Sequence, residues 1–99
     1  MNAAARRVFA NLKIRGLLDL VDQVCERRGV TREELCGRSQ TRSVARARHE
    51  LWYLMIEHPE RYYSHNEIGR LFERDHTTVM GGVRAHRRRE AGRQLNAAR

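Results

Sequence analysis

Apolar residues recur at helical spacing along most of the chain, and this spacing constrains the fold more than any other feature. In residues 16–28 they occupy positions i, i+1, i+4, i+7 and i+8, as Leu17, Leu18, Val21, Val24 and Cys25. Such spacing places them on one face of a helix. A broader apolar stripe, including Trp52, between about Ser43 and His58 predicts the central, most buried helix. The sequence therefore predicts an all-α fold.

Local start and stop signals divide the chain into further helices. Thr31 with Glu34, and Ser64 with Glu67, have the spacing of a capping box, which marks a helix start. We expect helices to end at Gly29, Gly37 and Pro59. Residues 38–43 lack periodicity and are expected to form a polar, basic loop. A last helix should start after Asp75, and the polar stretch beyond Arg89 is expected to fray.

The length of 99 residues corresponds to one domain. A single proline and the lack of alternating β-branched residues argue against a sheet. Residues 1–15 are rich in alanine and arginine and are interpreted as a frayed or helical lead-in, with the domain proper at 16–99. The chain opens on Met1 without the apolar segment of a signal peptide, and no apolar run is long enough for a membrane span, so we expect a cytoplasmic protein.

The charge balance favours a polyanionic partner. Twenty Lys and Arg residues against twelve Asp and Glu residues leave a net charge of +8, and Lys13 is the sole lysine. Such an excess creates a field that attracts nucleic acid, and arginine suits bidentate contact with phosphate and guanine. A basic surface that merely aids solubility is the alternative interpretation.

The sequence offers little for catalysis. It has no P-loop motif for ATP, and its five histidines form no His-Glu-x-x-His pattern. Cys25 and Cys36 lie in apolar patterns and are interpreted as small core residues. Tyr62 and Tyr63 are expected to pack against the start of the next helix rather than to stack on bases. We therefore expect no enzyme activity, no metal site and no cofactor.

Two short helices separated by a tight turn indicate a helix-turn-helix. The first covers about residues 64–72, and the second begins at Asp75. Short or polar side chains surround this second start, as Arg74, Asp75, His76, Thr77 and Thr78. The unpaired amides of a helix start favour a phosphate, and Thr or Asp side chains can contact base edges. The alternative is that Asp75 and Thr77 do no more than cap the helix.

The string Arg74–Val79 resembles the signature of the C-terminal DNA-binding domain (domain IV) of the bacterial DnaA replication initiator. Three other segments resemble that domain in the same order, at residues 30–39, 42–48 and 67–72. The resemblance covers roughly residues 17–88. It implies a Trp-repressor-like helical fold with a helix-turn-helix that binds double-stranded DNA at a DnaA-box-like site.

The resemblance also implies roles for individual residues. Residues 74–78, from Arg74 to Thr78, would contact the major groove. Arg48 would touch phosphate, and the basic loop would lie over the backbone and the adjacent minor groove, through Arg38, Gln40, Arg42, Ser43 and Arg46. Arginines fit such a site because a narrow minor groove has a strongly negative potential.

Three departures from the family pattern affect the expected target sequence. Gln40 stands where the family usually has a basic residue, and Gly81 where many members have histidine. The turn Glu73-Arg74 is one residue shorter than the usual Gly-Gly-Arg. We therefore do not expect a consensus DnaA box.

The first hypothesis is sequence-specific duplex binding by a stand-alone DnaA-like domain that lacks the ATPase and regulates transcription or replication initiation. One alternative is an adaptor that docks on a protein partner in replication or transcription through its basic surface. Another is non-specific binding of nucleic acid. Salt dependence measured with duplex competitor separates these hypotheses.

Overall fold

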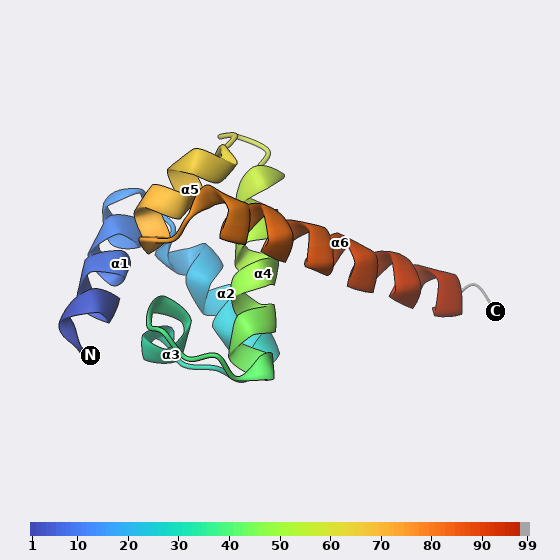
Figure 1. Ribbon diagram of the computed structural model, residues 1–99, viewed down its shortest axis with the longest axis horizontal. Coiled ribbons are helices and arrows are strands. Elements are labelled where there is room, and N and C mark those ends of the chain that lie inside the picture. The colour runs from blue at the N-terminus through green and yellow to red at the C-terminus, as the bar shows by residue number, and fades with distance from the viewer. Residues whose placement is uncertain (98–99) are drawn as a thin grey trace.

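The structure is a computed structural model that describes residues 1–97, and within this range it is entirely helical (Figure 1). The helices are α1 (Ala3–Ile14), α2 (Leu18–Arg28), α3 (Arg32–Cys36), α4 (Arg42–Ile56), α5 (His65–Phe72) and α6 (His76–Ala97). The predicted all-α class with a helix-turn-helix is confirmed. The loop before α4 is shorter than predicted, because α4 already begins at Arg42.

Helix α4 is the centre of the core, as its broad apolar stripe predicts. It packs against α2, α3, α5 and α6 (Figure 1). Leu51 and Met55 are fully buried, and Trp52 is 1% exposed, which confirms the core assignment of this tryptophan. Its ring lies edge-on to Phe72 of α5. The helix-turn-helix is thus mounted on the most buried element of the molecule.

The predicted helix boundaries follow from backbone chemistry. Both capping boxes are formed: the Thr31 hydroxyl accepts from the Glu34 amide at 3.1 Å, and the Ser64 hydroxyl accepts from the Glu67 amide at 3.1 Å. Gly29 ends α2 in the left-handed conformation with φ of 66°, which glycine adopts without a Cβ penalty.

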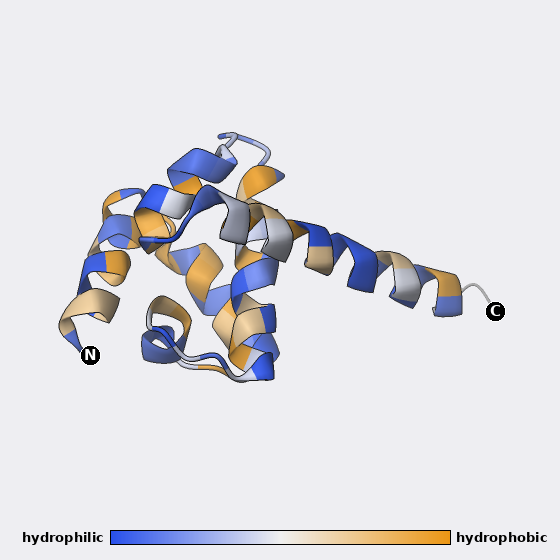
Figure 2. Ribbon diagram, in the orientation of Figure 1, coloured by the Kyte–Doolittle hydropathy of each residue, from blue (hydrophilic) through white to orange (hydrophobic). Residues whose placement is uncertain are grey.

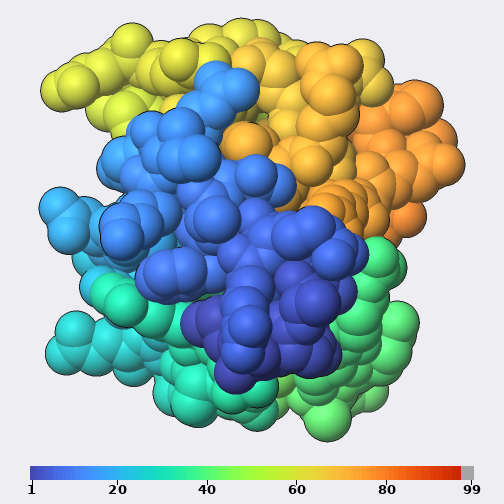
Figure 3. Space-filling model, turned by 90° about the vertical axis from the view of Figure 1, so that its left-hand side faces the viewer, coloured from blue at the N-terminus to red at the C-terminus, as the bar shows by residue number. Residues whose placement is uncertain are grey.

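The N-terminal segment forms helix α1 and packs into the same core as the rest of the chain. Ala5, Val8 and Leu12 are buried. In Figure 3, α1 (dark blue) faces the viewer between α3 and the α5 region, and it contacts both helices. The Asn11 amide also donates to the Leu71 carbonyl oxygen at 3.0 Å. Residues 1–15 are therefore largely helical and contribute core side chains.

Both cysteines are free and buried, in agreement with their interpretation as packing residues. Burial raises the pKa of Cys36 to about 11 and also raises that of Cys25, so both are thiols at neutral pH. Tyr63 is buried before α5, whereas Tyr62 is 69% exposed and does not pack as expected. None of the helices in residues 1–97 is long and apolar enough to cross a membrane.

Helix α6 differs from its prediction in length. The sequence predicts fraying beyond Arg89, but the helix continues to Ala97. Its second half extends away from the body of the molecule and is largely hydrophilic (Figures 1 and 2). The first half crosses α4 closely at Gly82, where an added Cβ would lie 2.6 Å from the His49 ring. Gly82, which looks unfavourable in a helix, is thus required by packing.

Candidate nucleic-acid interface

Residues 75–78, the residue before α6 and the first three residues of that helix, form an exposed part of the helix-turn-helix. We call it the α6 turn. All four residues are exposed, and the side chains of Asp75 and His76 are 66% and 51% accessible. The Asp75 carboxylate accepts from both the Thr77 amide and the Thr77 hydroxyl at 3.0 Å. These two bonds, the amide bond first, lower the pKa of Asp75.

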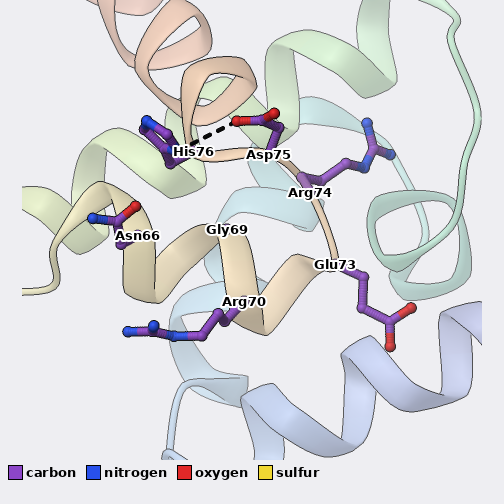
Figure 4. A pocket seen from close by; sticks show the side chains of 7 residues that line it. All are labelled: Asn66, Gly69, Arg70, Glu73, Arg74, Asp75 and His76. Atoms are coloured by element: carbon purple, nitrogen blue, oxygen red, sulfur yellow. Dashed lines mark ion pairs between the residues drawn. The ribbon is translucent and has the colours of Figure 1, made fainter.

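Capping therefore explains the presence of Asp75 and Thr77, in agreement with the alternative interpretation. It does not explain His76 and Thr78, because neither side chain bonds a backbone amide. The His76 ring lies 3.3 Å from the Asp75 carboxylate (Figure 4). Thr78 donates its amide to the Asp75 carbonyl oxygen and keeps an exposed side chain. The α6 turn thus presents an imidazole and a hydroxyl beside a carboxylate that already caps the helix.

The two residues before the α6 turn point to different neighbours. Glu73 adopts a left-handed conformation, with φ of 54°, which bends the chain sharply between α5 and α6. Figure 4 shows its side chain directed towards α1, where Arg7 forms a bidentate pair with it at 2.7 and 3.0 Å. Arg74 extends towards the α3 side instead (Figure 4). A shallow pocket lies beside this turn, lined by Asn66, Gly69, Arg70, Glu73, Arg74, Asp75 and His76.

Gly69 makes the tight turn possible. An added Cβ at this position would lie 2.7 Å from the Arg74 carbonyl oxygen and 3.4 Å from the His76 amide nitrogen. The Arg74 amide in turn donates to the Gly69 carbonyl oxygen at 2.8 Å. Sequence reasoning assigns Gly69 no role, although a glycine inside a short helix, where it lowers helix propensity, is the available signal.

The segment between α3 and α4, residues 37–41, lies next to the helix-turn-helix, and we call it the α3–α4 loop. The Arg74 guanidinium donates to the Gly37 carbonyl oxygen at 3.2 Å. Burial, followed by the charge of Arg38, lowers the pKa of Arg74. Arg38 and Gln40 flank Ser39 in this loop, and both are exposed while Ser39 is half-buried. The structure therefore brings together the two segments in which the sequence placed candidate contacts, with Arg74 as the bridge.

Arg48 does not fit the phosphate contact expected of it. It is 3% exposed, and its guanidinium donates to four backbone carbonyl oxygens between 2.7 and 2.9 Å. The acceptors are those of Glu34, Leu35, Gly37 and Ser39. Burial lowers its pKa to about 10, which still leaves it charged at neutral pH. Arg48 is thus an internal anchor of the α3–α4 loop, because these carbonyls occupy the donors that a phosphate would need.

The remaining predicted backbone contacts lie at the start of α4. Arg42, Ser43 and Arg46 line a groove together with Arg28 from the end of α2. Arg42 and Ser43 are exposed and Arg46 is half-buried. Sequence reasoning did not identify Arg28, which also forms an ion pair with Glu50 at 2.9 Å. The residue before α4 provides no side-chain cap, and the first turn carries no acidic residue, so the unpaired amides there face a basic surrounding.

Within residues 1–97, no cluster of three or more His, Cys, Asp or Glu side chains has a geometry suited to a metal ion. The groups around the α6 turn and the α3–α4 loop are hydrogen-bond donors, acceptors and guanidinium charges. Such groups can hold phosphates and contact base edges, with phosphate contacts fixing position and base contacts giving specificity.

Comparison with known proteins identifies the same family of helix-turn-helix. Residues 18–85 match the protein family described as bacterial DnaA protein helix-turn-helix. The chain is 34% identical over 64 residues to the chromosomal replication initiator protein DnaA of Oleidesulfovibrio alaskensis, and 35% identical over 66 residues to DnaA 2 of Protochlamydia amoebophila. These alignments cover 65% and 67% of the chain but 13% and 14% of those proteins. No solved structure is detectably similar. The chain belongs to the bacterial DnaA helix-turn-helix family of DNA-binding domains.

Proposed function

We propose that this chain binds double-stranded DNA at preferred sequences and thereby regulates transcription or the initiation of replication. The α6 turn would enter the major groove, and the α3–α4 loop would lie over the backbone and the adjacent minor groove. Because the sequence contains no P-loop, we propose that this chain acts by binding and not by catalysis.

One observation supports this proposal above all. The hydrogen bond from Arg74 to the Gly37 carbonyl oxygen holds the exposed α6 turn beside the α3–α4 loop, where Arg38 is exposed. A duplex presents a major groove and a minor groove on either side of one backbone. A protein that contacts both grooves needs two contact segments in fixed relative positions, and this bond ties the two candidate segments together.

The side chains of the α6 turn match the chemistry of base edges. Asp75 can accept from the N4 amino group of cytosine, and Thr78 can contact a thymine methyl or a phosphate. In the loop, Gln40 can hydrogen-bond acceptors in the minor groove without adding charge. Because the family usually places a basic residue there, we expect less dependence on a narrow minor groove.

A random-duplex selection on the purified chain, followed by fluorescence anisotropy, tests this function. We expect one enriched sequence, and binding to it at least about tenfold tighter than to a scrambled duplex at the same salt concentration. The dissociation constant should rise with salt, with a log–log slope of about 0.9 per neutralised phosphate.

The alternatives give different results in the same assay. Equal affinity for selected and scrambled duplex would favour non-specific binding of nucleic acid and would contradict the proposed specificity. An adaptor for a protein partner would show no duplex binding, and a duplex competitor would leave its protein complex intact.

A further inference from the structure

Helix α6 continues well beyond the part that packs against the core. It has 22 residues, which corresponds to about 33 Å at the rise of an α-helix. The major groove is about 12 Å wide. If the first turn enters the groove, the second half of the helix must lie beyond it, next to the sugar–phosphate backbone or in solvent. Figure 1 shows this half projecting away from the body of the molecule.

Two arginines of α6 lie on the same face as the α6 turn. Arg84 and Arg88 follow Thr77 by 7 and 11 residues, which at 3.6 residues per turn places each within about 20° of Thr77 around the helix axis. Gly81 lies on this face between Thr77 and Arg84, and an added Cβ there would meet no neighbour within 4 Å. The face is therefore open from the α6 turn to Arg88.

The arginines of α6 differ in whether their charge is already paired. Arg87 forms an ion pair with Glu57 at 3.1 Å, and Arg93 forms one with Glu90 at 2.8 Å. Arg84 and Arg88 are both exposed and form no ion pair or side-chain hydrogen bond within residues 1–97. The face in line with the α6 turn thus carries the exposed arginines of α6 that have no acidic partner within residues 1–97.

A neighbour links this face to the start of α4. Arg89 lies beside Arg88 in the chain and contacts the His49 ring of α4 at 3.0 Å. Burial lowers its pKa first, and the charges of Arg46, Arg28 and Arg88 lower it further. Arg46 and Arg88 therefore both lie within electrostatic range of one guanidinium. Positive charge therefore extends from the start of α4 to this part of α6.

We propose that Arg84 and Arg88 bind backbone phosphates of the duplex at the edge of the groove that receives the α6 turn. This inference rests on the proposed function and extends it, because it adds a phosphate-binding row that reaches past the family match at residue 85. A phosphate oxygen satisfies a guanidinium that no acidic side chain neutralises.

Matched double variants test the row. Arg84→Ala/Arg88→Ala and the control Arg87→Ala/Arg93→Ala each remove two positive charges from the same helix. Alanine favours helix in all four positions, and circular dichroism checks that both variants stay folded. Anisotropy on the selected duplex, with several base pairs of flanking DNA, gives the dissociation constant at a series of salt concentrations.

We expect the salt slope of Arg84→Ala/Arg88→Ala to be smaller than that of the wild type by about 2, since one lost phosphate contact lowers it by about 1. The control should keep the wild-type slope. Phosphate-ethylation interference should show positions at the edge of the site that matter for the wild type and the control but not for Arg84→Ala/Arg88→Ala.

Two results would overturn the inference while leaving the proposed function in place. One is specific binding in which both double variants lower the slope equally, because the charges then act at a distance. The other is specific binding with an unchanged slope and interference pattern in Arg84→Ala/Arg88→Ala. A wild-type protein that binds no duplex would instead contradict the proposed function itself, and the inference would fall with it.

Discussion

The α3–α4 loop and the α6 turn lie side by side, yet they are held in opposite ways. The loop backbone is fixed from inside the protein by the buried guanidinium of Arg48, which contacts two carbonyl oxygens of the loop and two at the end of α3. The α6 turn is fixed by its own cap, through Asp75 and Thr77, and its side chains are exposed. One segment has an internal anchor and the other is a helix start.

The difference follows from what each backbone can do for itself. A helix start satisfies most of its polar groups through the helix and one cap. An irregular loop has no such regular partners, so its buried carbonyls need donors from elsewhere. Arginine supplies several donors in one plane, which explains why a charge is buried here. We therefore expect the loop to depend on a single side chain, whereas the α6 turn depends on packing and capping.

Removal of the internal anchor should give the largest effect. Arg48→Met keeps an unbranched apolar stem but leaves buried carbonyl oxygens without donors, so we expect a loss of about 3–5 kcal/mol in the free energy of unfolding. Urea denaturation measures this loss. Arg46→Met, two positions away and half-buried, is the control and should change the free energy by less than about 1 kcal/mol. Equal losses in the two variants would show that Arg48 is not the anchor.

Arg48 also shows where sequence reasoning ends. The helix that contains Arg48 and the two capping boxes were predictable from the sequence, because they depend on periodicity and on residues three or four positions apart. Whether an arginine points outwards or into a loop depends on contacts with residues 9–14 positions away, which a local pattern does not contain. The same holds for Arg28, whose place in a groove depends on how α2 meets α4.

The α6 turn was more accessible to prediction. Its exposure and its cap follow from short-range chemistry, and the string Asp75–Thr78 carried the resemblance to the family. The sequence of this segment could not predict how closely other parts of the chain approach the two helices. Gly69 and Gly82 look like weak points in two helices, but at both positions another chain segment passes within 3 Å of where a Cβ atom would stand. Tertiary packing therefore reverses the meaning that helix propensity gives them.

The packing beneath the α6 turn should be the second most sensitive feature. Gly69→Ala places a methyl group against the Arg74 carbonyl oxygen, and we expect a loss of about 1–3 kcal/mol in the free energy of unfolding. Gly81→Ala is the matched control, since its Cβ meets open space in a helix and should stabilise by up to about 1 kcal/mol. Thermal and urea unfolding measure both. A neutral Gly69→Ala would show that α5 and α6 can separate at no cost.

Exposed side chains of the α6 turn should affect DNA binding and not stability. Thr78→Ala removes a hydroxyl that caps nothing, so we expect the free energy of unfolding to change by less than about 0.5 kcal/mol. Discrimination between the selected and scrambled duplexes should fall by about 1–3 kcal/mol if Thr78 contacts a base. His76→Ala should behave in the same way. Equal weakening on both duplexes would assign these side chains to the backbone instead.

The smallest effects should come from the caps of the two helices in the motif. Ser64→Ala breaks the capping box of α5 and should cost about 1 kcal/mol in the free energy of unfolding. Base preference should stay the same, since Ser64 lies at the opposite end of α5 from the α6 turn. Urea denaturation measures the loss of stability, and a repeated selection tests the base preference. A changed selected sequence would contradict the expected independence of base preference from this cap.

Asp75→Asn should have the reverse effect of Ser64→Ala: it should change the base preference and leave the free energy of unfolding nearly unchanged. Asparagine caps a helix about as well as aspartate, so we expect a change in the free energy of unfolding of less than about 0.5 kcal/mol. A carboxylate can accept from cytosine N4, whereas an asparagine amide can pair with adenine. If the proposed contact is made, a repeated selection should shift one position from cytosine towards adenine. An unchanged selected sequence would mean that Asp75 is a cap alone. The α6 turn would then contact bases through His76 and Thr78, and Asp75 would only cap its helix, as Ser64 caps α5.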